Sequence, residues 1–113
     1  MVGTPEPPYF AVIFSSRRSG ADDGYALTSD RMLELAAGRD GYLGVESVRD
    51  DAGVGITVSY WRDEESIAGW RADAEHTAAR QAGRARWYRD FTVRVALVTR
   101  AYGFTGHEVR PVA

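Results

Sequence analysis

The sequence contains no cysteine and no lysine, and it has only two histidines, His76 and His107. Without cysteine there is no disulfide, no thiolate nucleophile and no zinc–sulfur site. Without lysine, Schiff-base chemistry through a side-chain amine is excluded, and all 14 basic residues are arginines. Two histidines are too few for the usual imidazole-based transition-metal site, so we expect no metal.

The sequence also lacks long apolar runs, an excess of positive charge and nucleotide-binding loops. No stretch approaches the ~20 apolar residues of a membrane-spanning helix, and the opening residues MVGTPEPPYF lack the apolar run of a secretion signal. The formal net charge is −2, so nothing attracts the chain to nucleic acid or to an anionic membrane. No P-loop, dinucleotide fingerprint or nucleophile elbow is present. We therefore expect a cytoplasmic protein with no nucleic-acid or membrane partner and no cofactor.

With 113 residues, 44% hydrophobic and 27% charged, the chain has the composition of one globular domain. The proline-rich residues 1–8 are expected to be an extended N-terminal lead-in. Residues 9–104 form the predicted domain, and residues 105–113 form a C-terminal tail without periodicity.

The most informative stretch is 55–83, which predicts a strand followed by a long helix. Val54, Ile56, Val58 and Tyr60 alternate with Gly55, Thr57, Ser59 and Trp61, a period of two that is typical of a strand. The carboxylates that follow, from Asp63 onward, suit the first turn of a helix because they face its unpaired N–H groups. Gly83 is a plausible end for that helix.

Three further strands and one further helix complete the predicted order. Strands are expected at 9–16, 42–49 and 91–102, a helix from Asp22 or Asp23 to Gly38, and a β-hairpin turn at 50–53. The order βαββαβ predicts an α+β, ferredoxin-like fold, with two helices on one face of a four-stranded antiparallel sheet. The other sheet face is too apolar to remain in water, so we expect a second copy to cover it in an obligate homodimer.

The long helix has a conventional core stripe, which includes Ile67 and Trp70, and a nearly opposite row of small residues. This row contains Gly69, Ala72, His76, Ala79 and Gly83. His76 is either a proton-transfer group in a pocket, since its ordinary pKa suits neutral pH, or a packing histidine bonded to a neighbour. The small residues around it leave room for either a ligand or another backbone.

Several segments together resemble the antibiotic-biosynthesis monooxygenase-like proteins. They are GYLGVES (41–47), GITVSYW (55–61), IAGWRADAEH (67–76), RARWY (84–88) and VALVTRAYGF (95–104). The resemblance extends from Tyr9 to Phe104. It implies a dimeric α/β barrel and a cofactor-independent monooxygenase that acts on a small aromatic or polyketide-like molecule, with the substrate itself activating oxygen.

On this interpretation His76 is the expected catalytic residue, and the expected substrate-binding residues are Trp70, Phe14, Trp61 and Arg80. The aromatic residues also fit a second interpretation, because large rings at core spacing commonly only pack. A non-catalytic dimeric barrel, which binds a small molecule or serves a structural role, is therefore the alternative function.

Haem degradation, a third activity within the same superfamily, fits the residues least well. The resemblance to that branch requires a tryptophan early in the second helix, which Trp70 supplies. The haem-ligating histidine should follow ten residues later, where this chain has Arg80, and the first strand should carry an asparagine that is absent from IFSSRR. We therefore expect no bound haem.

Overall fold

The computed structural model describes residues 2–20, 25–80, 88–106 and 108–110, with only the backbone described at 25–29, 75–80, 105 and 108–110. The elements are β1 (Tyr9–Arg18), α1 (Tyr25–Ala37), β2 (Tyr42–Arg49), β3 (Val54–Trp61), α2 (Glu64–Arg80), β4 (Tyr88–Val98), β5 (Gly103–Thr105) and β6 (Glu108–Arg110). The predicted order βαββαβ is confirmed, and a short C-terminal hairpin follows it.

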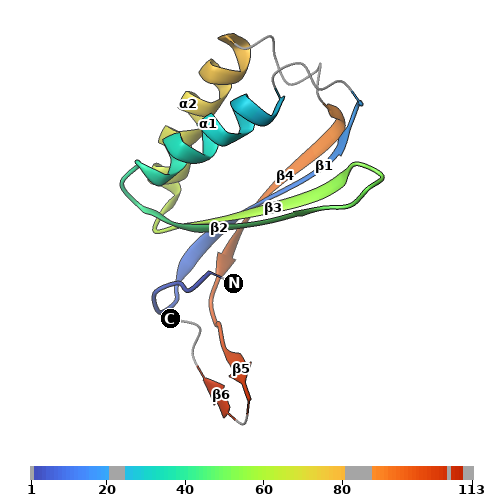
Figure 1. Ribbon diagram of the computed structural model, residues 1–113. Helices are drawn as coiled ribbons and strands as arrows, with labels where there is room; N and C mark the ends of the chain where they lie inside the picture. Colours follow the sequence, from blue (N-terminus) through green and yellow to red (C-terminus); the bar gives the residue numbers. More distant parts are fainter. Residues whose placement is uncertain (1, 21–24, 81–87, 107, 111–113) are drawn as a thin grey trace.

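The four long strands form one antiparallel sheet in the order β2-β3-β1-β4, and both helices lie on the same side of it (Figure 1). This arrangement confirms the predicted ferredoxin-like fold. The central strands are β3 and β1, while β2 and β4 form the edges. We call the side under the helices the helix face and the opposite side the outer face.

The core lies between the helix face and the two helices. Val12 from β1 and Trp61 from β3 pack with Ala36 of α1 and Ile67 of α2. The period of two in β3 explains this placement, because it directs Trp61 toward the helices and Tyr60 toward the outer face. The burial of these aliphatic and aromatic side chains is the main contribution to the free energy that keeps the helices packed on the sheet.

The outer face is partly covered by the N-terminal lead-in. Tyr9 is buried, and its hydroxyl oxygen accepts a hydrogen bond from the Thr4 hydroxyl at 2.8 Å. Val2 lies against the backbone of Gly44 on β2. The lead-in therefore packs against one end of the sheet. The other end of the outer face keeps Val48, Val54 and Ile56 exposed.

Three predicted boundaries differ from the structure. β1 continues two residues beyond Ser16, and β4 starts at Tyr88 instead of Phe91 and ends at Val98 instead of Tyr102. The extension arises because Arg17 of β1 lies opposite Asp90 of β4 and the two side chains form an ion pair. The alternation of apolar residues, from which the strands are predicted, does not reveal a strand end that is stabilised by an ion pair. The predicted helix start at Asp22 or Asp23 and helix end at Gly83 lie outside the described residues.

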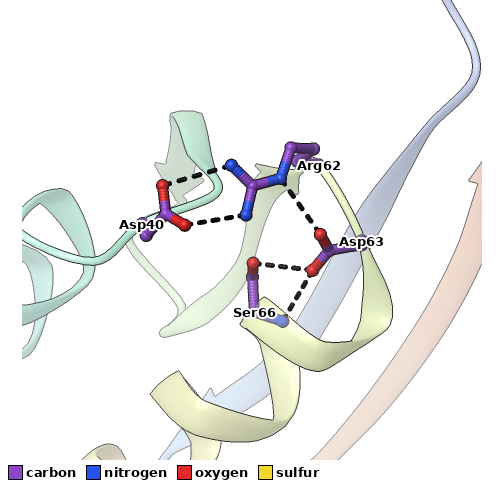
Figure 2. Close-up of polar contacts among 4 residues, drawn as sticks. All are labelled: Asp40, Arg62, Asp63 and Ser66. Carbon is purple, nitrogen blue, oxygen red and sulfur yellow. Dashed lines mark hydrogen bonds and ion pairs between the residues drawn. The ribbon is translucent and has the colours of Figure 1, made fainter.

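A polar network joins the start of α2 to the loop after α1 (Figure 2). The Asp63 carboxylate accepts hydrogen bonds from the backbone N–H of Ser66 at 2.8 Å and from its hydroxyl at 2.7 Å. This is an N-cap, and it confirms the helix start that the carboxylates predicted. The Arg62 guanidinium donates to Asp63 at 3.0 Å and makes a two-pronged ion pair with Asp40.

These contacts make part of the stability dependent on acid pH. The Ser66 hydroxyl and N–H, followed by Arg62, lower the pKa of Asp63 to about 2. Because the folded-state value lies below the ordinary one, the stabilisation is present above about pH 4 and is lost as pH falls toward 2. Asp63→Asn keeps a capping side chain but cannot titrate. We expect the melting-temperature difference between the two proteins to shrink steadily from pH 5 to pH 2. An unchanged difference across that range would contradict the assignment.

Candidate functional site

A groove of about 410 Å³ lies between α2 and the edge strand β4. Its lining residues are Glu64, Ile67, Ala68, Arg71 and Ala72 from α2 and Val95 from β4. The groove exists because β4 carries a helix-facing apolar row that the two helices do not cover. The row is Phe91, Val93, Val95 and Leu97, and these side chains are 38% to 52% exposed. A single chain rarely leaves such a continuous apolar row in water without a use for it.

The two walls of the groove are chemically simple. Ala68 and Ala72 stand one helical turn apart and keep the α2 wall shallow, while Val95 and Ile67 supply aliphatic surface. Glu64 and Arg71 are the charged residues of the lining. Such a site suits a ligand with an apolar body and few polar atoms.

Both walls continue toward the C-terminal end of α2. Position 76 follows Ala72 by four residues in α2, so it lies on the same helical stripe as Ala68 and Ala72. Along β4, Val93 and Phe91 continue the row that Val95 begins. The side chains of His76 and Arg80 lie outside the described residues, and only their backbone positions in α2 are given.

Phe14 lies on the same sheet face as the groove. It is opposite Val93 in the β1–β4 register, and its ring stacks on Phe91 with centroids 5.3 Å apart. The ring of Tyr88 packs edge-on against the ring of Phe14, with centroids 5.3 Å apart. The predicted substrate-binding residue Phe14 therefore stands beside the apolar row, in an aromatic cluster at the far end of the sheet wall.

The two predicted tryptophans occupy the core end of the helix face. Trp61 is completely buried; its indole N–H donates to the Ser59 hydroxyl at 2.9 Å, and its ring packs edge-on against Tyr42. Trp70 is half-buried and lies over Trp61 with ring centroids 5.5 Å apart. Within the part of the chain that the structure describes, the buried indole N–H of Trp70 has no acceptor.

The room at Gly69 has an occupant in the structure. A Cβ there would come within 3.2 Å of the Arg39 Cζ atom, and closer still to one of its nitrogens. Arg39 reaches across from the loop after α1 and forms an ion pair with Asp73, one turn beyond Gly69. The row of small residues is thus divided, because Gly69 receives a side chain of the same protein while Ala72 lines the groove. The ion pair of Arg39 with Asp73 causes this division, and no pattern in the sequence reveals that pair.

Glu46 and Ser47 are neighbours on β2, and their side chains lie on opposite faces of the sheet. Glu46 accepts a hydrogen bond from the Tyr60 hydroxyl at 2.8 Å, whereas Ser47 bonds Thr57 at 2.7 Å. Burial, followed by the bond to Glu46, raises the pKa of Tyr60 to about 12. Tyr60 therefore stays protonated around neutrality and is a hydrogen-bond donor rather than a base.

Among the described residues, no cluster of three or more histidine and acidic side chains is placed to hold a metal ion. The described helices also include none with the length and apolarity that crossing a membrane requires.

Val95 and Ala68 are groove residues that the sequence reasoning did not select. A signal was available for Val95, because alternate residues of the last strand are apolar. The sequence does not show that the two helices leave β4, the strand that carries Val95, uncovered.

Comparison with known proteins shows which family this chain resembles in sequence. A family model described as antibiotic biosynthesis monooxygenase matches residues 8–82. The uncharacterized protein YqjZ of Bacillus subtilis (strain 168) is 57% identical over 97 residues, which cover 86% of this chain and 85% of that protein. Jasmonate monooxygenase ABM of Pyricularia oryzae (strain 70-15) is 34% identical over 95 residues, which cover 80% of this chain but only 43% of that protein.

Among solved structures, SnoaB from Streptomyces nogalater, described as a cofactor-independent oxygenase, superposes with a TM-score of 0.62. The match covers 83% of this chain and 94% of that one at 13% identity, so it shows a shared fold. The family model spans well over half of the sequence. The chain therefore belongs to the antibiotic biosynthesis monooxygenase family.

Proposed function

We propose that the protein is a cofactor-independent monooxygenase whose substrate, a small aromatic or polyketide-like molecule, binds in the groove between α2 and β4. The observation that carries the proposal is the groove itself, with small residues on its helix wall and an uncovered apolar row on its sheet wall. The family and the description of SnoaB support the type of reaction.

The proposed reaction asks little of the protein. A base removes a proton from an activated CH₂ group, and the resulting carbanion is electron-rich enough to reduce dioxygen directly. The CH₂ group becomes a carbonyl, with one oxygen atom retained in the product and the other leaving as water, and all four electrons come from the substrate. An apolar site favours such a step, because it holds a flat, oxidisable molecule away from competing proton donors.

His76 is the proposed base. Its position continues the Ala68–Ala72 stripe, and a neutral imidazole can accept a proton near pH 7. Phe14 extends the apolar wall on the sheet side, and Arg80, one turn beyond His76, is proposed to bind the substrate at that end. Trp70 is proposed to bound the core end of the site. The buried Trp61 contributes by supporting the ring of Trp70.

A homodimer is part of the same proposal. Val48, Val54 and Ile56 leave an apolar patch on the outer face, and a second copy would cover it. Light scattering should give a mass near twice 12.5 kDa. The cytoplasmic location expected from composition stays a prediction.

A non-catalytic ligand-binding barrel is the competing function, and the groove supports its ligand equally well. The two functions differ in whether oxygen is consumed. Anthrone is a suitable probe because its CH₂ group is flanked by two aromatic rings and lies opposite a carbonyl; jasmonic acid is a second probe, chosen from the description of the fungal relative. Uptake of ¹⁸O₂ into the product, with no cofactor added, distinguishes an enzyme from a binding protein.

His76→Ala is expected to lower turnover of the probe by at least ~100-fold, because it removes the proposed general base. Its melting temperature should change little. Oxygen uptake under saturating probe measures the loss, and the pH–rate profile of the unaltered protein should rise through the titration of one group near pH 6–7.

Two variants serve as controls for this result. His107→Ala removes the other histidine and should keep full turnover. Val95→Trp fills the groove and should abolish probe binding even with His76 intact. If His76→Ala melts far below the unaltered protein while probe binding persists, the histidine packs against a neighbour and the proposed role is wrong.

A further inference from the structure

An arginine side chain crosses the helix face of the sheet near the β2–β3 turn. Arg49, the last residue of β2, pairs with Gly55 of β3, and Gly55 pairs in turn with Ser16 of β1. These residues share the face of Trp61, because Gly55 and Trp61 are an even number of residues apart in β3. The Arg49 Nη2 atom donates to the Ser16 hydroxyl at 2.8 Å. The guanidinium is therefore held over the central strands, on the side where the proposed substrate binds.

Gly55 makes this path across the sheet possible. A Cβ at Gly55 would lie 2.5 Å from the Arg49 Cζ atom and within 2.9 Å of two of the guanidinium nitrogens. The φ angle of Gly55 is not left-handed, so the backbone itself does not require glycine. Glycine inside a strand weakens the strand and often marks a place that another group approaches closely. Here the approaching group is the guanidinium of Arg49.

The positive charge of Arg49 has no carboxylate partner among the described residues, unlike the charges of Arg17, Arg31, Arg39 and Arg62. Within that part of the chain, its hydrogen bonds go to two neutral oxygens, the Gly53 carbonyl and the Ser16 hydroxyl. A guanidinium has five N–H donors, so three remain that no described residue accepts. Arg49 is half-buried, and buried charges are normally paired. The arrangement therefore suits an anion supplied from outside the chain.

An aromatic surface adjoins this cation on the same face. Ser16 pairs with Phe91 of β4, and the Phe91 ring stacks on Phe14, two residues before Ser16 in β1. Val95, in the groove, lies four residues beyond Phe91 along β4, which is a distance of ~13 Å. An elongated apolar molecule on this wall would bring a group at one of its ends to Arg49.

We propose that Arg49 and Ser16 form a carboxylate-binding subsite, and that the ligand of the proposed site is a flat aromatic acid. A carboxylate can accept two parallel N–H bonds from one guanidinium, and the Ser16 hydroxyl can donate a third bond to it. The bonds to Gly53 and Ser16 hold the guanidinium in place before the ligand arrives, which lowers the entropy cost of binding. The inference rests on the proposed function for the place of the ligand and adds the charge of that ligand.

Anthracene-2-carboxylate and its neutral amide, anthracene-2-carboxamide, test the subsite because they share one aromatic body. In fluorescence titrations at pH 7.5, we expect the unaltered protein to bind the carboxylate at least ~10-fold more tightly, since hydrogen bonds between charged groups are the stronger ones. Arg49→Gln should abolish this preference. Arg31→Gln removes the same charge from an exposed position on α1 and should retain the preference.

Gly55→Ala tests the same subsite without removing any charge. The new Cβ displaces the guanidinium, which can shift because it is the far end of a flexible side chain. We expect the preference for the carboxylate to fall at least ~10-fold, with unchanged circular dichroism. This variant keeps the test decisive if Arg49→Gln does not fold.

The outcomes separate the subsite from the proposed oxygenase. The subsite is wrong if the unaltered protein binds both probes equally or neither, or if the preference survives in Gly55→Ala and in folded Arg49→Gln. Each of these results holds whether or not anthrone is oxidised. A preference that is lost in the variants, together with no oxygen uptake from anthrone, would support the subsite and overturn the proposed reaction.

Discussion

Gly41→Ala is expected to destabilise the protein by ~2–5 kcal/mol, far more than an alanine substitution at a comparable glycine. Gly41 has φ +91°, a conformation that costs an L-residue ~1–2 kcal/mol. In addition, a Cβ at this position would lie 2.6 Å from the Cβ of Ser66 and closer still to its hydroxyl. That hydroxyl is bonded to the N-cap Asp63, so it cannot yield without loosening the start of α2; overpacking of this kind costs ~1–3 kcal/mol.

Gly20→Ala is the matched control. Gly20 has a similar φ of +96°, but a Cβ there would meet no atom of the described residues within 4 Å. The difference between the two variants in urea unfolding therefore isolates the clash from the backbone strain. Equal losses at both positions would show that Ser66 moves aside freely and that the junction in Figure 2 is looser than its hydrogen bonds indicate.

Trp61→Ala is expected to cost ~3–5 kcal/mol, because it removes the only fully buried large side chain among the described residues. The cavity would lie directly under Trp70 and beside Tyr42, and it would leave the Ser59 hydroxyl without its donor. Such a loss is a large part of the 5–15 kcal/mol stability of a typical domain. Chemical unfolding followed by circular dichroism measures it.

Trp61→Phe is the conservative counterpart, which keeps an aromatic ring but not the indole N–H. It should lose less than half as much stability and keep the helix content. In the proposed enzyme it should also keep probe turnover within a few-fold, since Trp61 supports the site and does not face the groove. A stability loss below ~1 kcal/mol in Trp61→Ala would contradict the placement of this residue at the centre of the core.

The fold could be predicted from the sequence because local signals and burial agree. The alternation in 54–61 fixed which face of β3 carries Trp61, and the carboxylates after it fixed where α2 begins. The turn at 50–53 is as expected, with Gly53 at φ +89° and the Asp50 N–H bonded to the Val54 carbonyl. Each of these features depends on residues close together in the chain.

The remaining features depend on contacts between distant residues. Arg39 fills the space at Gly69 from 30 positions away, and the ion pair of Arg17 with Asp90 extends a strand that apolar periodicity ends earlier. The hairpin of β5 and β6 lies in a segment with no hydrophobic period. The groove forms because two helices are too few to cover all four strands of the sheet. Hydrophobic periodicity does not reveal which strand the helices leave uncovered.

Both ends of the described chain leave the sheet at the same end, near the start of β1 and the end of β4 (Figure 1). In terms of gene architecture, this geometry makes duplication within one reading frame easy to accommodate. A second copy could follow the first through a connection long enough to reach the start of the partner's β1. Fusion would also end the requirement that both halves be identical. One half could then retain the functional site while the other half retained only the contacts that stabilise the first.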